Sequence, residues 1–181
     1  DKAMRLKHLT DDLVEASKIS SGNVKLELTR LNFQELIQQT NGEFSEKFEA
    51  KGLKLVVDMP EEPVVIVADG RRLWRVVENL YNNTAKYAMP NTRVYVELTT
   101  VGHMVRFSIK NISEQPLNIN AEELTERFIR GDVARSTEGS GLGLSIARNL
   151  TELQKGSFNI YLDGDLFKVT IIFPEAEEKN E

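Results

Sequence analysis

The sequence predicts a two-layer α/β sandwich, in which a mixed β-sheet packs on helices and a long N-terminal helix precedes it. Segments with the alternating apolar pattern of strands come mainly in pairs joined by short turns, such as Val101-Gly102-His103. Segments with the apolar spacing of helices lie between these pairs and can cover one face of the sheet. Because the strands come as hairpins, a doubly wound parallel sheet is the less favoured alternative.

The composition excludes several classes of protein. With 181 residues, of which 40% are hydrophobic and 28% charged, the chain has the composition of a folded globular domain. The absence of cysteine excludes a thiol nucleophile, a disulfide framework and a Cys-ligated zinc site. The net charge of −5 gives no general attraction to nucleic acid or anionic lipid. The longest apolar run, residues 64–68, is far shorter than the ~20 residues of a membrane helix. From the net charge we expect no contact with nucleic acid, and from the short apolar runs we expect no contact with membrane.

The first segment has the apolar spacing of a helix over residues 2–20. Its stripe is narrow and heptad-like, and consists of Leu6, Leu9, Leu13 and Ala16. Such a stripe fits either a partner helix or the core of the chain's own domain, and the sequence leaves both open. Turn-forming residues at 20–23 end this helix, and residues 24–28 alternate like a short strand.

Asn32 is the expected N-cap of a second helix, because Glu35 follows three residues later as in a capping box. Gly52 is the expected end of this helix. Its buried side is predicted to consist of Leu36, Ile37, Phe44 and Phe48. Residues 53–59 and 64–68 are predicted strands on either side of a turn at 60–63.

Asp69 is the expected N-cap of a third helix, which runs to about residue 88. Its core stripe is Leu73, Val76, Val77, Leu80 and Thr84. The remaining predicted elements are strands at 93–100 and 104–110, a short helix at 121–130 capped by Asn120, a helix at 141–155 ending at Gly156, strands at 158–162 and 166–173, and a charged, disordered tail at 175–181. The connection over 111–139 is of a length that is usually functional or mobile.

A glycine-rich sequence, Gly139-Ser140-Gly141-Leu142-Gly143-Leu144, opens the helix predicted over 141–155. Glycines at a helix start let the backbone approach a ligand, and the free N–H groups and the helix dipole favour an anion such as phosphate. The sequence is not a P-loop, because no Gly-Lys-Ser/Thr follows, and it lacks the preceding strand of a dinucleotide-binding fingerprint. The alternative is that these glycines serve only a tight turn and close helix packing.

The third helix carries a polar face about a quarter-turn from its core stripe. This face consists of Asn79, Asn83, Lys86 and Tyr87. Amide oxygens are suitable ligands for a hydrated Mg²⁺, a lysine can bind phosphate, and a tyrosine offers a ring and a hydroxyl. A merely solvated polar face is the alternative explanation when these residues are taken alone.

Three segments, in the same order and at matching spacing, resemble the characteristic boxes of sensor histidine kinases. Residues 79–87 resemble their N box, residues 126–130 their F box and residues 139–144 their second glycine box. Residues 1–22 resemble the second helix of the family's dimerisation and phosphoacceptor hairpin, so the resemblance covers nearly the whole chain. It implies a linker strand at 23–32, a catalytic ATP-binding domain of the Bergerat (GHKL) type at 33–174 and a tail at 175–181.

The resemblance implies ATP and Mg²⁺ as cofactors and assigns roles to individual residues. Asn83 would bind Mg²⁺ with help from Asn79, while Lys86 and Tyr87 would contact the nucleotide. Phe128 would anchor a lid over the nucleotide, and Gly139 would be the hinge of that lid. Arg130 and Arg135 would contact phosphate. The backbone of Gly141, Leu142 and Gly143, followed by Leu144, would surround the triphosphate. Asn79, Lys86 and Arg130 would be the catalytic residues.

Two features depart from the family pattern. The first glycine box normally places an aspartate after a strand, followed by spaced glycines, whereas here Asn111 occupies that position and no glycine follows. An asparagine oxygen still accepts a hydrogen bond from the adenine N6 amine. Neither His8 nor His103 fits the phosphoacceptor position, so the phosphoacceptor helix of the parent kinase is expected outside this chain.

The expected function is that of the ATP-binding catalytic fragment of a sensor histidine kinase. It would transfer the γ-phosphoryl group of Mg·ATP to a histidine outside this chain, and from there to the receiver domain of a response regulator. The parent protein is expected to be a homodimer anchored in the plasma membrane, with this part in the cytoplasm.

Other functions remain open at the sequence level. An ATP-hydrolysing GHKL ATPase is one, although the glutamate that such enzymes carry one turn before the metal-binding asparagine is replaced by Asn79. An anti-sigma-factor serine kinase shares the boxes, but the opening heptad helix disfavours it. A degenerate nucleotide-binding or scaffold domain without turnover is the remaining hypothesis, and the altered first glycine box is what supports it.

Overall fold

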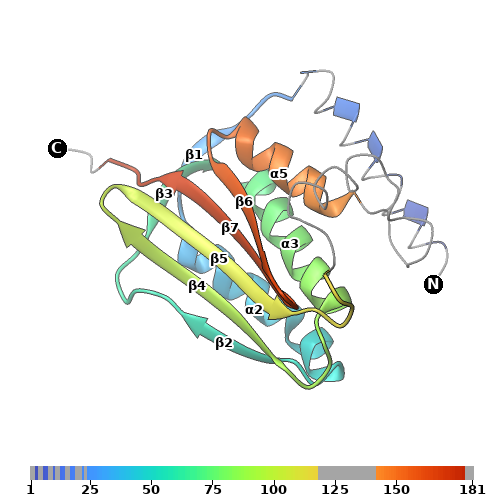
Figure 1. The fold of residues 1–181 in the computed structure, drawn as a ribbon. Helices are drawn as coiled ribbons and strands as arrows, with labels where there is room; N and C mark the ends of the chain where they lie inside the picture. The colour runs from blue at the N-terminus through green and yellow to red at the C-terminus, as the bar shows by residue number, and fades with distance from the viewer. Residues whose placement is uncertain are drawn as a thin grey trace.

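The computed structural model describes residues 24–117 and 142–177, together with separate positions before residue 24. A five-stranded sheet of order β2-β4-β5-β7-β6 forms one layer, and helices cover one of its faces (Figure 1). The strands are β2 (Lys54–Asp58), β4 (Arg93–Val101), β5 (Met104–Ile112), β6 (Ser157–Asp163) and β7 (Leu166–Pro174). The helices are α2 (Phe33–Ala50), α3 (Gly70–Tyr87) and α5 (Gly143–Leu153). The predicted two-layer α/β arrangement is confirmed for these elements.

The sheet is mixed, as predicted. β2 pairs in parallel with β4, whereas all other neighbours in the sheet are antiparallel. Both predicted hairpins are present, with Val101 opposite Met104 in the first and Asp163 opposite Leu166 in the second. The strands on either side of the turn at 60–63 do not pair with each other. β2 joins the main sheet, and β3 (Val65–Asp69) forms a separate two-stranded sheet with β1 (Leu28–Asn32).

The strand predicted over 24–28 is wrong in position, because the observed strand β1 begins at Leu28. Its register places Leu28 opposite Asp69 and Asn32 opposite Val65. Before Leu28 the backbone is held by a side chain instead, since the N–H of Glu27 donates to Asp69 Oδ2 at 3.0 Å. Residues 24–27 therefore form no strand despite their alternation, because β3 pairs only with the residues from Leu28 onward.

Asn32 caps α2 as predicted. Its Oδ1 accepts from the backbone N–H of Gln34 at 3.1 Å, and its Nδ2 donates to the Glu35 carboxylate at 3.0 Å. The helix ends at Ala50, and Gly52 follows with a φ of +68°, in the left-handed region that glycine favours.

The core lies between the helices and the sheet, and aromatic side chains fill much of it. The Phe33 ring lies 5.7 Å from that of Phe107, and Tyr81 stacks on Phe48 at 5.8 Å between centroids. Phe33 is fully buried and was not predicted in the core. The predicted buried side of α2 is confirmed for Ile37, Phe44 and Phe48. Leu36 is half-buried because it lines a surface cavity.

The N-terminus of α3 is fixed from two sides. Asp69 is its N-cap, as predicted, and its Oδ1 accepts from the N–H of Arg72 at 3.1 Å. The N–H of Asp69 in turn donates to Gln154 Oε1 at 2.8 Å, which ties α3 to the end of α5. The whole predicted core stripe of α3 is buried, namely Leu73, Val76, Val77, Leu80 and Thr84.

α5 is two residues shorter at each end than the helix predicted over 141–155. At its C-terminal end the left-handed residue is Lys155, with a φ of +64°, and not Gly156. Gly156 is required for space, because a Cβ at that position would lie 2.7 Å from the Phe173 ring.

The helix predicted over 2–20 is not established as one element, because only separate positions of it are described. Among these positions, Leu6 and Leu13 are helical and exposed. At the other end of the chain, the first residues of the tail expected to be disordered are ordered. The N–H of Glu175 donates to the carbonyl of His103 at 2.9 Å, while residues 178–181 lie outside the described part.

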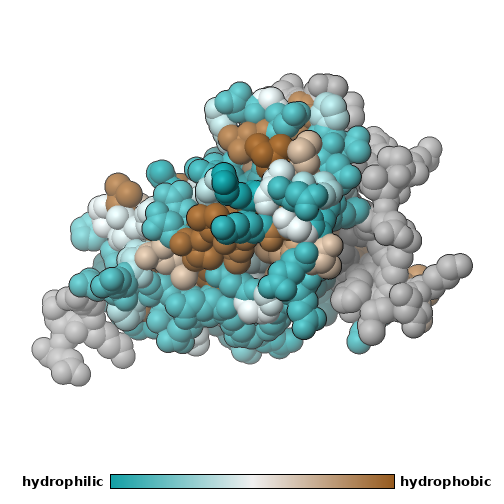
Figure 2. Space-filling model, turned by 90° about the horizontal axis from the view of Figure 1, so that it is seen from below, coloured by the Kyte–Doolittle hydropathy of each residue, from teal (hydrophilic) through white to brown (hydrophobic). Residues whose placement is uncertain are grey.

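One side of the molecular surface is mainly polar. The underside of the molecule, on the side of β2 in Figure 1, is mostly hydrophilic with a few apolar patches (Figure 2). In the part of the chain that the structure describes, no helix is long and apolar enough to cross a membrane.

Candidate functional site

The second half of α3 carries the predicted polar face, and its residues differ in burial. Asn79 is buried, with 9% of its surface exposed, whereas Asn83, Lys86 and Tyr87 are half-buried. Asn79, Asn83 and Lys86 follow one another at about one helical turn, and Tyr87 is next to Lys86, so this face leads from the protein interior to its surface.

Asn79 and the start of α5 form the central contact of the site. Asn79 Nδ2 is a buried donor without a hydrogen-bond partner in the described chain. Gly143, the first residue of α5, lies against the same side chain, since a Cβ built on it would be 3.3 Å from Asn79 Oδ1. An unpaired buried donor costs on the order of 1–3 kcal/mol, and a ligand that supplies an acceptor removes this cost. The fold thus brings the predicted polar face and the glycine-rich segment together at an unsatisfied donor.

Asn111 lies near the end of β5 and is buried against α3. Its Oδ1 accepts from the Thr84 hydroxyl at 3.5 Å, and its Nδ2 donates to the carbonyl of Ile112 at 3.1 Å. Thr84 belongs to the same helical segment as Asn79 and Asn83. The residue predicted to face adenine therefore adjoins the helix predicted to hold the phosphates and the metal.

Contacts to the chain after β5 fix the C-terminal end of α3. The N–H of Glu114 donates to the carbonyl of Tyr87 at 2.8 Å. Lys51 Nζ donates to the carbonyl of Lys86 at 2.8 Å and lies 3.3 Å from the Glu114 carboxylate. The Lys86 ammonium itself lies 4.7 Å from the centroid of the Tyr87 ring, in a cation–π contact. These contacts hold Lys86 and Tyr87 together at one end of the site.

Asn82, next to Asn83 in sequence, has a different environment. Its Oδ1 accepts from Lys47 Nζ of α2 at 2.7 Å. Partial burial lowers the pKa of the Lys47 ammonium, and the nearby Glu78 carboxylate opposes that shift. Asn82 therefore links two helices and does not belong to the polar face.

The donor set of the site suits a magnesium-bound nucleotide. Among the described residues there is no cluster of three or more His, Asp or Glu side chains that could hold a metal ion. A Mg²⁺ here would take amide oxygens from the protein and further oxygens from nucleotide and water. The unpaired donor of Asn79 fits an acceptor such as a phosphate oxygen. The residues present therefore fit both components of Mg·ATP.

Part of the predicted site lies outside the described residues, namely Phe128, Arg130, Arg135, Gly139 and Gly141, together with the short helix predicted over 121–130. The rest of the glycine segment is described. Leu144 is buried in the core, and the carbonyl of Leu142 accepts from the N–H of Ile146 at 2.9 Å as α5 begins.

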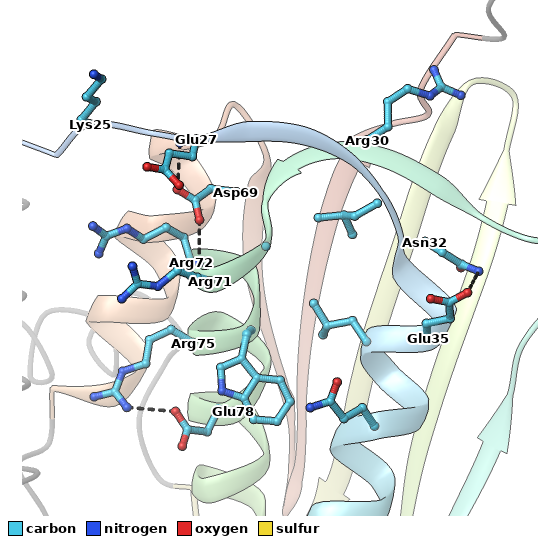
Figure 3. A pocket seen from close by; sticks show the side chains of 15 residues that line it. Lys25, Glu27, Arg30, Asn32, Glu35, Asp69, Arg71, Arg72, Arg75 and Glu78 are labelled. Carbon is cyan, nitrogen blue, oxygen red and sulfur yellow. Dashed lines mark hydrogen bonds and ion pairs between the residues drawn. The ribbon is translucent and has the colours of Figure 1, made fainter.

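A cavity of about 920 Å³ lies at the opposite end of α3, and none of the predicted site residues lines it. Figure 3 shows Arg71, Arg72 and Arg75 on one side of the first turns of α3, with Arg75 2.9 Å from the Glu78 carboxylate. Basic and acidic side chains line this cavity in nearly equal number, and Trp74 forms part of its wall. This cavity was not predicted from the sequence, although its three arginines lie within five positions of the chain.

Comparison with known families decides the assignment. Residues 68–177 match the family described as histidine kinase-, DNA gyrase B-, and HSP90-like ATPase. The chain belongs to this family. The matched segment contains the polar face of α3, Asn111 and the glycine-rich start of α5, which are the parts of the site predicted from the sequence.

Individual relatives place the chain among the sensor histidine kinases of this family. Sensor protein VanS of Enterococcus faecium is 31% identical over 152 residues, which cover 83% of this chain and 39% of that protein. The solved catalytic domain of histidine kinase ThkA is 26% identical with a TM-score of 0.72, and the match covers 83% of this chain and 97% of that one. This chain therefore contains the catalytic ATP-binding domain of a sensor histidine kinase.

The histidine-kinase domain is only a part of such proteins. The chain spans less than half the length of the curated relatives that it matches, such as 39% of VanS. ThkA has also been solved in complex with response regulator protein TrrA. That structure matches with a TM-score of 0.74 at 24% identity, covering 99% of this chain and 50% of that one, and at this identity the likeness concerns the fold.

Proposed function

We propose that this domain transfers the γ-phosphoryl group of Mg·ATP to a histidine outside this chain, on the phosphoacceptor helix of a homodimeric parent kinase. The receiver domain of a response regulator would then take the phosphoryl group. The observation that carries this proposal is the buried amide donor of Asn79 beside Gly143, which has no hydrogen-bond partner among the residues that the structure describes. A fixed donor at a glycine-rich helix start suits the oxygen atoms of a polyphosphate.

The residues of α3 divide the work of holding the nucleotide. Asn79 would donate to a phosphate oxygen from the interior, and the missing side chain of Gly143 lets that oxygen approach the α5 backbone. Asn83, one turn further on, would supply an amide oxygen to Mg²⁺, whose charge offsets that of the phosphates when it is bound. Lys86 would add a positive charge near the surface.

Asn111 would read the base. Its Oδ1 already accepts from the Thr84 hydroxyl, which orients the amide, and a carbonyl oxygen has a second lone pair for the N6 amine of adenine. A neutral amide makes a weaker bond here than the family's carboxylate. The proposal also includes residues outside the described part of the chain. Phe128 and Gly139 would anchor and hinge the lid, and Arg130, Arg135 and the backbone of Gly141 would contact the phosphates.

The residue one helical turn before Asn83 favours phosphoryl transfer over ATP hydrolysis. Asn79 is an amide there, and an amide does not accept a proton from an attacking water. The neighbouring carboxylate, Glu78, forms an ion pair with Arg75 at 2.9 Å. Neither group is placed to serve as a general base.

The wider setting of the domain follows from the same resemblance. Residues 1–22 are proposed as the second helix of the phosphoacceptor hairpin, with the domain in the cytoplasm of a kinase anchored in the plasma membrane. The ThkA–TrrA complex supports a response regulator as the partner, since a protein of this fold binds one.

Calorimetric titration with ATP, with and without Mg²⁺, tests the proposal, with GTP as a competitor. We expect magnesium-dependent binding that favours ATP and is lost in Asn83→Ala. Asn82→Ala is the matched control, because it removes the same amide from the adjacent position, where it contacts Lys47 instead. Absence of binding at millimolar ATP, or equal losses in both variants, would contradict the proposed site and favour a scaffold domain.

A further inference from the structure

One face of the sheet is covered by no described helix (Figure 1). The strand pairing places a row of four aromatic and basic residues on this face. The strand registers place them side by side across β4, β5, β7 and β6. Tyr95 is opposite Lys110, Lys110 is opposite Lys168, and Lys168 is opposite Tyr161. Both tyrosines are exposed, Tyr161 at 56%, and both lysines are half-buried. We call these four residues the Tyr–Lys row.

The two lysines lie directly opposite each other on neighbouring strands, where their mutual repulsion disfavours the fold. Like charges directly opposite on neighbouring strands are destabilising. Lysines often protect the edges of sheets from pairing, but β5 and β7 are interior strands of this sheet. In the described part of the chain, Lys168 forms no ion pair, and the Lys110 ammonium lies 5.0 Å from the Tyr95 ring centroid. A pair of unneutralised ammonium groups on an exposed face is suited to an anionic ligand.

The positive charge of the row continues into the next row of the same face, where Lys54 of β2 is opposite Arg93, and ends on the other side at Asp58 and Glu97. Glu97 lies on the neighbouring row of the same face, where its carboxylate accepts from Ser108 at 3.4 Å. Asp163 of β6, opposite Leu166, places a negative charge beside the row at its other edge. A nucleic acid or a membrane needs an extended basic surface, and the net charge of the chain is −5. The carboxylates of Asp58, Glu97 and Asp163 border this basic region, so it suits a short segment with a few carboxylates better than a long polyanion.

The dimensions and surroundings of the row fit a short polypeptide. Three inter-strand spacings of about 4.8 Å separate the outer tyrosines, a distance that about four extended residues span. Ile112 and Leu166 pair with each other on the next row of this face, and Ile112 is exposed. Tyrosine rings and aliphatic side chains provide apolar contact beside the two charges.

We propose that the Tyr–Lys row is a docking surface for an acidic segment of a partner protein. Two carboxylates of that segment, two positions apart, would bind the ammonium groups of Lys110 and Lys168. Its aliphatic parts would lie on Tyr95, Tyr161 and the Ile112–Leu166 pair. This surface is on the opposite side of the sheet from α3, so its occupant and the nucleotide would not contact each other.

Fluorescence anisotropy of a labelled octapeptide of alternating glutamate and threonine tests the proposal. We expect wild-type protein to bind it in a salt-sensitive manner, and Lys110→Gln/Lys168→Gln to bind about fivefold or more weakly. Lys7→Gln/Lys25→Gln is the control, because it removes the same charge from exposed lysines elsewhere. Both double variants should bind Mg·ATP as wild type does, and Lys110→Gln/Lys168→Gln should melt at the same temperature or higher.

Three results would overturn the proposal. Equal weakening in the two double variants would mean that only net charge matters. A lower melting temperature for Lys110→Gln/Lys168→Gln would mean that the lysines serve the fold. Tighter binding of a single-stranded oligothymidylate or of phosphatidylserine vesicles than of the peptide would assign the row to another class of ligand. A lysine–threonine octapeptide should bind no variant.

Discussion

At the scale of single residues, the contact between Asn79 and Gly143 sets how closely α3 and α5 approach each other. The asparagine could be predicted from the polar face and the glycine from the glycine-rich segment. Their proximity could not, because it depends on how two helices distant in sequence pack. The same packing leaves Asn79 Nδ2 buried and without a hydrogen-bond partner among the described residues, and this is the observation behind its proposed role at the nucleotide.

Gly143→Ala is expected to weaken Mg·ATP binding by about tenfold, because its Cβ would press on Asn79 Oδ1 from 3.3 Å and displace the amide. Stability should change by less than about 1 kcal/mol, since alanine also favours the helix. Calorimetric titration and urea unfolding measure the two effects. Gly42→Ala is the control, as a Cβ there meets no atom within 4 Å. If both variants bind ATP equally well, Gly143 does not face the ligand.

Tyr81→Phe is expected to cost about 1 kcal/mol at neutral pH, because the Tyr81 hydroxyl donates to Asn41 Oδ1 at 2.6 Å. Burial raises the pKa of the Tyr81 phenol above its ordinary value of about 10. A raised pKa in the folded state gives stability that is present below pH ~10 and lost as the pH rises further. The difference in unfolding free energy between wild type and Tyr81→Phe should therefore become smaller above pH ~10.

Urea unfolding at a series of pH values checks this expectation. Tyr161→Phe is the matched control, because that ring is 56% exposed and its hydroxyl should contribute little. A difference that stays constant or widens above pH ~10 would contradict the assignment of Tyr81 as a phenol held protonated by burial.

At the scale of elements, the N-terminus of α3 shows how local and distant signals combine. Asp69 is an N-cap that the sequence predicts, because a short acidic side chain precedes an amphipathic segment. Gln154 at the end of α5 satisfies the N–H of the same Asp69, and no local pattern indicates this contact. Elements that share such a junction are expected to unfold together.

Gln154→Ala should destabilise the domain by about 1–3 kcal/mol, since it leaves the buried N–H of Asp69 without an acceptor. Chemical denaturation measures the loss, and hydrogen exchange should show faster exchange at the Asp69 amide. Gln39→Ala is the control, because among the described residues the bond of that side chain is to Glu43 on the helix surface. Equal stability losses in both variants would mean that the junction is unimportant.

At the scale of the whole molecule, the described core begins at Leu31 and ends with β7. No residue before Leu31 belongs to the core of the described chain. Removal of residues 1–22 should therefore shift the melting temperature by no more than about 2 °C and leave Mg·ATP affinity unchanged. Calorimetry checks both quantities. A larger loss of stability would mean that the N-terminal segment packs on the domain, as in the alternative that its heptad stripe left open.

The sequence by itself determined what depends on neighbours along the chain. The caps at Asn32 and Asp69, the core stripe of α3 and the two hairpins follow from side-chain chemistry and periodicity within a few residues. The boxes of the family follow in the same way, since they are short motifs.

Only the tertiary structure decided which distant segments meet. It paired β2 with β4, moved the first strand to Leu28–Asn32 where β3 offers a partner, and placed the Tyr–Lys row across four strands. It also buried Asn79 against Gly143. The physical reason is that backbone pairing and close packing are satisfied by partners in space, and their identity depends on the whole set of competing contacts and not on any local pattern.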